Sequence, residues 1–146
     1  MKKRKIISIL LLIIGAALSV AFIVKIEFPQ GFEAYFKREY YNQYGPLVIS
    51  VELLFASYYL LIKHEKTNFA LALFGFTALL DPIFNQIGLF TSVVPLYGTI
   101  LLSICGLVCL WMAFANTFSL KRMSILATIA SVVLSVVIEL FFNYVR

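Results

Sequence analysis

Three acidic residues stand inside stretches that are otherwise apolar enough to cross a lipid bilayer. They are Glu52, Asp81 and Glu139. A helix places Asp81 on one face with Thr77 and Asn85, because residues four apart stack on one another. A charged side chain at the bilayer centre costs about 2.5–3.5 kcal/mol on insertion scales. Such carboxyl groups persist when they face the inside of a bundle, take up a proton, or meet a cation or water.

A polar stripe in the last apolar stretch supports an inward-facing polar seam. Its members recur at intervals of three or four residues: Ser124, Thr128, Ser131, Ser135, Glu139 and Asn143. We interpret the acids and their neighbours as a pocket that accepts a proton or a cation and opens toward the outer side of the membrane. The candidate pocket residues are Glu52, Tyr59, Thr77, Asp81, Asn85, Ser135 and Glu139. Purely structural hydrogen bonding between helices, worth about 0.6–2 kcal/mol for each bond, is the alternative, and for the serine stripe it is slightly favoured.

Catalytic and metal-binding patterns are missing from the sequence. It contains no G-x-S-x-G motif, no Gly-rich phosphate loop and no Ser/His/Asp set. The single histidine, His64, lies in a charged turn, and Cys105 and Cys109 are four apart in an apolar run. We therefore predict no catalytic residue and no metal site, and the sequence leans against an enzyme. No cofactor is predicted, although a quinone or a lipid stays open as a ligand.

The amino-acid composition indicates whether most of the protein surface faces water or lipid. Of the 146 residues, 62% are hydrophobic and 13% are charged, against about 45–50% and about 25% in soluble domains. A chain this short cannot bury so much apolar surface in its own core, so we expect it to face lipid. The net charge of +5 is spread over short connections and chain ends, which excludes a nucleic-acid surface.

We predict an all-α fold, a single transmembrane domain over residues 1–146. Five spans are expected, at about residues 6–24, 44–62, 69–90, 93–115 and 125–142. We read the first as an uncleaved span, because it is longer than a signal-peptide core. The connection after it repeats aromatic residues at helical spacing, namely Phe32, Tyr35, Phe36 and Tyr40. This spacing predicts a short amphipathic helix at the membrane interface. Whether residues 81–90 complete a span or re-enter the membrane stays open.

Basic residues set the expected orientation. With five spans and a cytoplasmic N-terminus, eight Lys and Arg side chains fall inside and four outside. This distribution fits the positive-inside tendency and places the C-terminus outside. The expected location is the inner, or cytoplasmic, membrane of a bacterium.

The basic start and the Val51-Glu52-Leu53-Leu54 stretch give a resemblance to a known group. The Leu80-Asp81-Pro82-Ile83 stretch is similar to uncharacterised small membrane families that have a Pro in this helix. Over about its first 115 residues the chain resembles small multi-pass bacterial membrane proteins of the DoxX-like kind. It differs from them in two ways: it lacks the Gly that they usually have shortly before the Lys at the end of the first span (Lys25 here), and it has an extra fifth span. The resemblance implies a small helical bundle, sometimes attached to redox or quinone-linked membrane systems. It transfers no catalytic residue.

Three functions remain open at this point. The first is an accessory or scaffold subunit that binds a membrane-protein partner, motivated by small residues such as Gly15 and Ser19 on the helix faces. The second is a small transporter or channel-like protein for protons, cations or a cationic solute, which would need a homo-oligomer to form a wide pathway. The third is a lipid- or quinone-binding redox helper, which rests mainly on the resemblance.

Overall fold

The computed structural model describes residues 2–26, 28, 30–36, 44–88, 95–115 and 124–144. Within these residues the structure is all-helical and has no strand, which confirms the predicted fold class. The long helices are α1 (Lys2–Ile23), α3 (Gly45–Ile62), α4 (Thr67–Gln86), α5 (Leu96–Ala115) and α6 (Ile125–Tyr144). Four of them, α1, α3, α4 and α5, are long and apolar enough to cross a membrane, and the part of α6 over Ile125–Phe141 is apolar but shorter. The protein is an integral membrane helical bundle.

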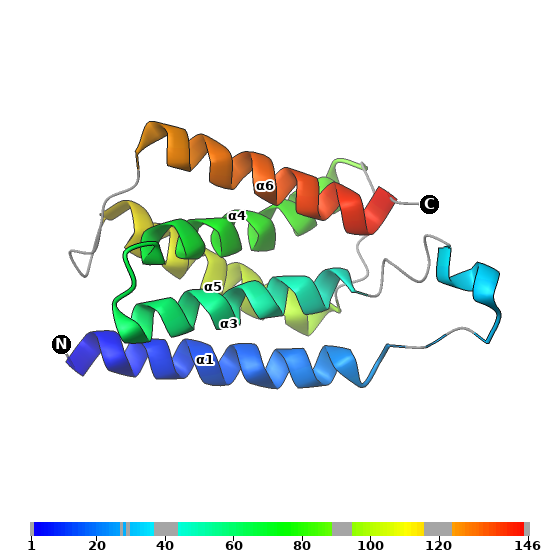
Figure 1. The fold of residues 1–146 in the computed structure, drawn as a ribbon, viewed down its shortest axis with the longest axis horizontal. Helices are drawn as coiled ribbons and strands as arrows, with labels where there is room; N and C mark the ends of the chain where they lie inside the picture. The colour runs from blue at the N-terminus through cyan, green and yellow to red at the C-terminus, as the bar shows by residue number, and fades with distance from the viewer. Residues whose placement is uncertain are drawn as a thin grey trace.

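Neighbouring helices run in alternate directions along the bundle (Figure 1). α1, α3, α4 and α6 lie one above the other, and α5 packs against α4 behind them. The two ends of the chain therefore lie at opposite ends of the bundle. The connection between α3 and α4 lies at the same end as the N-terminus, because Arg4 of α1 contacts the last turn of α3.

Each helix boundary has a local cause. Pro46 stands in the first turn of α3, where its missing N–H is not needed. Lys63 adopts the left-handed conformation (φ 58°) that ends α3. α4 continues through Pro82 to Gln86 as one helix, so the described part of this segment does not re-enter the membrane. It begins two residues earlier and ends four residues earlier than the predicted span of 69–90.

The described residues cover only the first part of the predicted interfacial helix. The structure has a 3₁₀ helix, η1, over Phe32–Phe36, and its two phenylalanine rings meet edge to face at 5.3 Å. A 3₁₀ helix rarely extends far because its side chains eclipse and its hydrogen bonds are poorly aligned. Tyr40 of the predicted helix lies outside the described residues.

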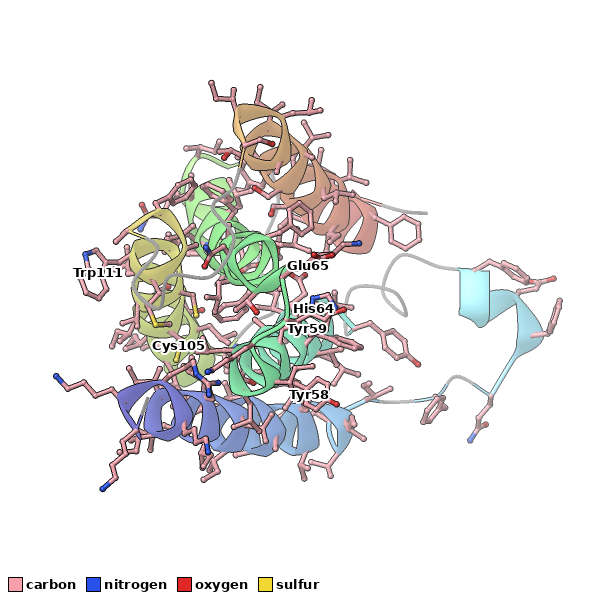
Figure 2. The ribbon with its side chains drawn as sticks, turned by 60° about the vertical axis from the view of Figure 1, so that its left-hand side comes forward. Tyr58, Tyr59, His64, Glu65, Cys105 and Trp111 are labelled. Carbon is pink, nitrogen blue, oxygen red and sulfur yellow. The ribbon has the colours of Figure 1, made fainter. Side chains whose placement is uncertain are left out.

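The apolar core is built by four helices and not by α6. Its buried side chains come from α1, α3, α4 and α5 and include Ile49, Leu53, Phe74 and Cys109. On α6 the buried side chains among the described residues are Ser131, Ser135 and Glu139. Many large apolar side chains lie on the outer surface of the bundle. Trp111, for example, points out of α5 with 65% of its surface exposed (Figure 2). α6 thus joins the bundle through a polar seam, with its apolar side chains toward lipid.

Candidate functional site

Polar side chains of three helices meet at two levels of the bundle. Glu52 lies ten residues before the end of α3, and Thr77 and Ser135 lie ten residues after the starts of α4 and α6. These helix ends share one end of the bundle (Figure 1), and a helix rises 1.5 Å per residue, so all three lie about 15 Å from that end. Asp81 and Glu139 follow four residues later, at about 21 Å. Thr77 and Asp81 on α4 and the predicted stripe residues Ser131, Ser135 and Glu139 on α6 are buried. Ser124 of the stripe is exposed, and the side chain of Asn143 lies outside the described part of the structure.

Asp81 and Glu139 form a buried pair across α4 and α6. Their exposed fractions are 4% and 3%. The two side chains share a hydrogen bond, and Glu139 also lies within electrostatic range of Glu52. Two carboxyl groups share a hydrogen bond only when one of them carries a proton, because an ionised carboxylate has no donor. A hydrogen bond between these two side chains thus requires a proton on one of them.

Glu52 is the acid without a hydrogen-bond partner. Both of its carboxyl oxygens are buried, and neither has a hydrogen-bonding partner among the described residues. The Thr77 hydroxyl lies beside it, but Thr77 donates its hydrogen to the Leu73 carbonyl oxygen at 2.8 Å. A buried carboxyl group without a partner is costly, so Glu52 calls for either a proton or a cation from outside the chain.

The serines of α6 fix that helix to α4. The single hydrogen of the Ser135 hydroxyl is shared between two acceptors, the Leu73 carbonyl oxygen of α4 at 3.2 Å and the Ser131 carbonyl oxygen of its own helix at 2.8 Å. Ser131 donates within α6, to the Thr128 carbonyl oxygen at 2.7 Å. Ser135 therefore makes the hydrogen bond between helices that was the structural alternative for this stripe. By holding α6 against α4, it also helps to place Glu139, which lies one turn further along α6.

A cavity of about 260 Å³ adjoins Glu52 between α3 and α4. We refer to it as the α3–α4 cavity. It is lined by Glu52, Phe55, Tyr59, Lys66, Phe69, Ala70 and Leu73. Lys66 immediately precedes α4, so this cavity extends from Glu52 toward the end of the bundle that holds the N-terminus. The predicted opening was toward the other end, and no residue pattern in the sequence distinguished the two directions.

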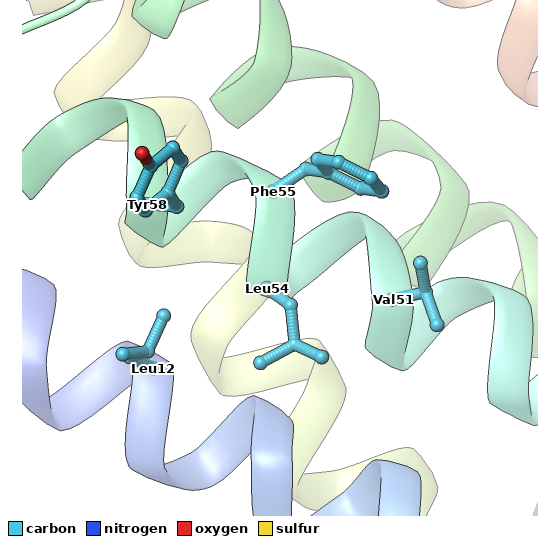
Figure 3. Close-up of a pocket in the computed structure, with 5 residues that line it drawn as sticks. All are labelled: Leu12, Val51, Leu54, Phe55 and Tyr58. Atoms are coloured by element: carbon cyan, nitrogen blue, oxygen red, sulfur yellow. The ribbon is translucent and has the colours of Figure 1, made fainter. Parts of the chain in front are cut away.

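A second cavity, of about 380 Å³, lies between α1 and α3. It is lined by Leu12 of α1 and by Val51, Leu54, Phe55 and Tyr58 of α3 (Figure 3). The lining is apolar throughout, and Phe55 and Tyr58 are both more than half exposed. This surface suits an acyl chain and offers no group that could bind an ion.

The α3–α4 turn is ordered by side chains next to the α3–α4 cavity. The rings of Tyr59 and His64 stack at 4.3 Å (Figure 2). His64 accepts a hydrogen bond from the Lys66 backbone N–H through Nδ1 at 3.0 Å. Thr67, fully buried, donates to the Tyr59 and His64 carbonyl oxygens. Tyr59, predicted as a pocket residue, is thereby held against the cavity.

One predicted pocket residue is exposed to the surroundings of the bundle. Asn85 is exposed near the end of α4, although it shares a helix face with Thr77 and Asp81. Helical spacing gives a direction around the axis, but it does not say how far along α4 the neighbouring helices still cover that face. Glu52, Tyr59, Thr77, Asp81, Ser135 and Glu139 are the predicted residues that the described structure places in or beside the seam and the cavity.

Two features of the site were missed from the sequence. Phe55 and Phe69 line the cavity, but an aromatic residue in an apolar span offers no contrast that would single it out. Arg4 was counted only as a charge on the cytoplasmic side, whereas its side chain is buried and donates to the Leu60 and Leu61 carbonyl oxygens at 2.5 and 2.6 Å. Its closeness to α3 could not be found from sequence spacing.

Within the described residues, no group of three His, Cys, Asp or Glu side chains could hold a metal ion. The three carboxyl groups are therefore neighbours without forming a closed coordination shell. Comparisons of the chain with protein-family models, with curated proteins and with solved structures gave no match.

Proposed function

We propose that this protein is a small membrane transporter that binds a proton or a monovalent cation at the carboxyl groups of Glu52, Asp81 and Glu139. The single observation that carries the proposal is Glu52, whose buried carboxyl oxygens have no hydrogen-bonding partner in the described chain and whose side chain lines a cavity. Intramembrane acids that face a cavity mark ion and proton pathways more often than they serve structure alone.

The order of the polar groups along the bundle supports transport over static binding. The α3–α4 cavity covers the stretch between Lys66 and Glu52. Beyond Glu52, the Asp81–Glu139 pair lies one helical turn closer to the opposite end. A cation or proton that enters through the α3–α4 cavity thus meets Glu52 before it meets the Asp81–Glu139 pair. The three acids divide the path across the apolar interior into shorter distances between binding groups.

The proposed location is the cytoplasmic membrane of a bacterium, with the N-terminus inside and the C-terminus outside. The clustering of basic residues supports this orientation, because the contact of Arg4 with the end of α3 brings Lys2, Lys3 and Lys5 to the same end as Lys63 and Lys66. The α3–α4 cavity then extends from Glu52 toward the cytoplasmic side.

Proton flux into proteoliposomes tests the proposal. The purified chain is reconstituted, a potassium gradient with valinomycin supplies the voltage, and an internal pH dye reports proton entry. We expect flux that Glu52→Gln and Asp81→Asn each abolish. Glu65→Gln is the matched control, because it removes an exposed acid from the α3–α4 turn and should leave the flux unchanged. Flux that survives both intramembrane substitutions would refute the proposal.

The accessory or scaffold role stays a prediction with a weaker basis. The small residues that motivated it are used inside the bundle: Gly15 faces Leu53 and Leu54, and Gly106 faces Gly75 and Ala78. Isolation in mild detergent together with a stoichiometric membrane-protein partner would favour this role. The lipid- or quinone-binding role suggested by the DoxX-like resemblance would be favoured by a quinone that co-purifies and occupies the apolar cavity between α1 and α3.

A further inference from the structure

The α3–α4 cavity combines one carboxyl group with aromatic walls. Glu52 lies at one part of its lining, and Phe55, Tyr59 and Phe69 supply rings from both α3 and α4. Aromatic faces attract cations through their quadrupole, and the attraction grows when the cation has shed its water. Both kinds of group therefore favour a positive charge in the same space.

The size and polarity of the cavity select the kind of cation. At about 260 Å³ it is far larger than the roughly 30 Å³ that one water molecule occupies in the liquid. Apart from Glu52, Tyr59 and Lys66, its lining side chains are apolar. A small inorganic ion would lose its hydration there without gaining enough oxygen ligands, whereas a cation surrounded by carbon atoms fits both the room and the walls.

Charge and exposure indicate the direction of access. Lys66 lines the part of the cavity next to the α3–α4 turn and is exposed, so its ammonium group opposes a cation that arrives from water at that end. Phe55 lines the same cavity and has 58% of its surface exposed on the outer face of α3, where lipid lies. A cation that enters the cavity from the lipid side, past Phe55, thus does not pass the ammonium group of Lys66.

We propose that the α3–α4 cavity binds a small lipophilic organic ammonium ion, which enters from the bilayer and lies between the rings of Phe55, Tyr59 and Phe69. The Glu52 carboxyl oxygens are covered in the empty cavity, and the side chain turns them toward the ion when the pair forms. This inference deepens the proposed function and rests on it, because it names the class of cation that the same acid takes.

Binding of benzyltrimethylammonium to the full chain in nanodiscs tests the inference. Equilibrium dialysis with the radiolabelled cation should give saturable binding of one ion per chain. Neopentylbenzene, which has the same shape without the charge, should not compete. Competition by neopentylbenzene at equal concentration would overturn the inference, because the cavity would then recognise shape and apolar surface only.

Two substitutions and two matched controls assign the site. Glu52→Gln should weaken binding about tenfold or more, because a charge-assisted contact is lost. Phe69→Leu should weaken it by about 2- to 30-fold, the range of one cation–π contact. Glu65→Gln in the turn and Phe114→Leu on α5 remove an acid and a ring outside the cavity lining, and should leave binding unchanged. Equal affinity of wild type and Glu52→Gln would refute the inference.

Thermal unfolding with and without the cation tests binding within each variant, so it can be used even when a variant is less stable than the wild type. A ligand that binds only the folded protein raises the unfolding midpoint, so the cation should raise that of the wild type and of Glu65→Gln but not that of Glu52→Gln. Proton flux separates the two proposals. Flux that depends on Asp81 without any ammonium binding would overturn the ammonium class alone. Ammonium binding that depends on Glu52, with no flux dependent on Asp81, would overturn transport alone.

Discussion

The guanidinium group of Arg4, in the first turn of α1, donates a hydrogen bond of 2.5 Å to the carbonyl oxygen of Leu60, in the last turn of α3. A second bond, of 2.6 Å, reaches the Leu61 carbonyl oxygen. The last carbonyls of a helix have no partner within the helix and carry the negative end of its dipole. A buried cation is therefore stabilised where α3 ends, and α1 is fixed in register against α3.

Replacement of Arg4 should destabilise the bundle. Arg4→Ala leaves the Leu60 and Leu61 carbonyl oxygens without this donor, and hydrogen bonds to charged groups contribute about 1.5–3 kcal/mol. We expect the free energy of unfolding in mixed micelles to fall by about that amount. Lys5→Ala removes an exposed charge from the neighbouring position and should change it by less than about 0.5 kcal/mol. Equal effects of the two substitutions would show that Arg4 acts only through net charge.

Ser135 should contribute more to the attachment of α6 than Ser131. Both are fully buried, but only Ser135 bonds across to α4, at the Leu73 carbonyl oxygen. Interhelical hydrogen bonds in membrane proteins average about 0.6 kcal/mol. Ser135→Ala should therefore lower the free energy of unfolding by about this amount more than Ser131→Ala. A larger loss at Ser131 would contradict the assignment of Ser135 as the link between the two helices.

The polar seam was predictable because its residues contrast with their surroundings. Ser131, Ser135 and Glu139 recur every four residues in an apolar run, and that spacing defines one face of a helix. Asn85 obeyed the same rule and still lies exposed, because periodicity carries no information about where along α4 its neighbours end. The pairing of Asp81 with Glu139 depends on which helices are neighbours in the bundle, and the spacing of residues within one helix does not give that.

Lys25 illustrates the limit set by long-range contacts. Its Nζ donates to the Tyr97 hydroxyl at 3.0 Å at the start of α5, 72 residues away in the chain. A contact between the residue that follows α1 and the start of α5 depends on how the five helices pack together. The spacing of residues within one helix does not give that arrangement.

The proposed topology predicts opposite accessibility for the two ends of the bundle. Cys105 and Cys109 are free and buried, so they should resist a membrane-impermeant maleimide, and replacing both with alanine gives a clean background. In intact bacterial cells, Gly31→Cys next to η1 should then react. Glu65→Cys in the α3–α4 turn should react only after the membrane is permeabilised. The reverse pattern would invert the orientation and place the α3–α4 cavity on the outer side.

Gly75 of α4 and Gly106 of α5 face each other at close range, and the tolerance of the two positions to an added methyl group can be ranked. A Cβ at Gly75 would lie 2.5 Å from Leu110 Cγ and 2.9 Å from the Gly106 carbonyl oxygen. A Cβ at Gly106 would meet Ala78 Cβ at 3.2 Å and the Gly75 carbonyl oxygen at 3.3 Å. The backbone oxygen near Gly75 cannot rotate away as a side chain can, so Gly75→Ala requires the two helices to separate.

We expect Gly75→Ala to lower the free energy of unfolding by about 1–3 kcal/mol, the usual cost of overpacking, and Gly106→Ala to lower it less. Gly31→Ala is the control, because no atom lies within 4 Å of its added Cβ. Alanine also favours helix over glycine by about 0.8–1.0 kcal/mol, so a stabilising result at Gly106 is compatible with a small local shift. A stabilising result at Gly75 is not, because it would mean that α4 and α5 are farther apart than the contact requires.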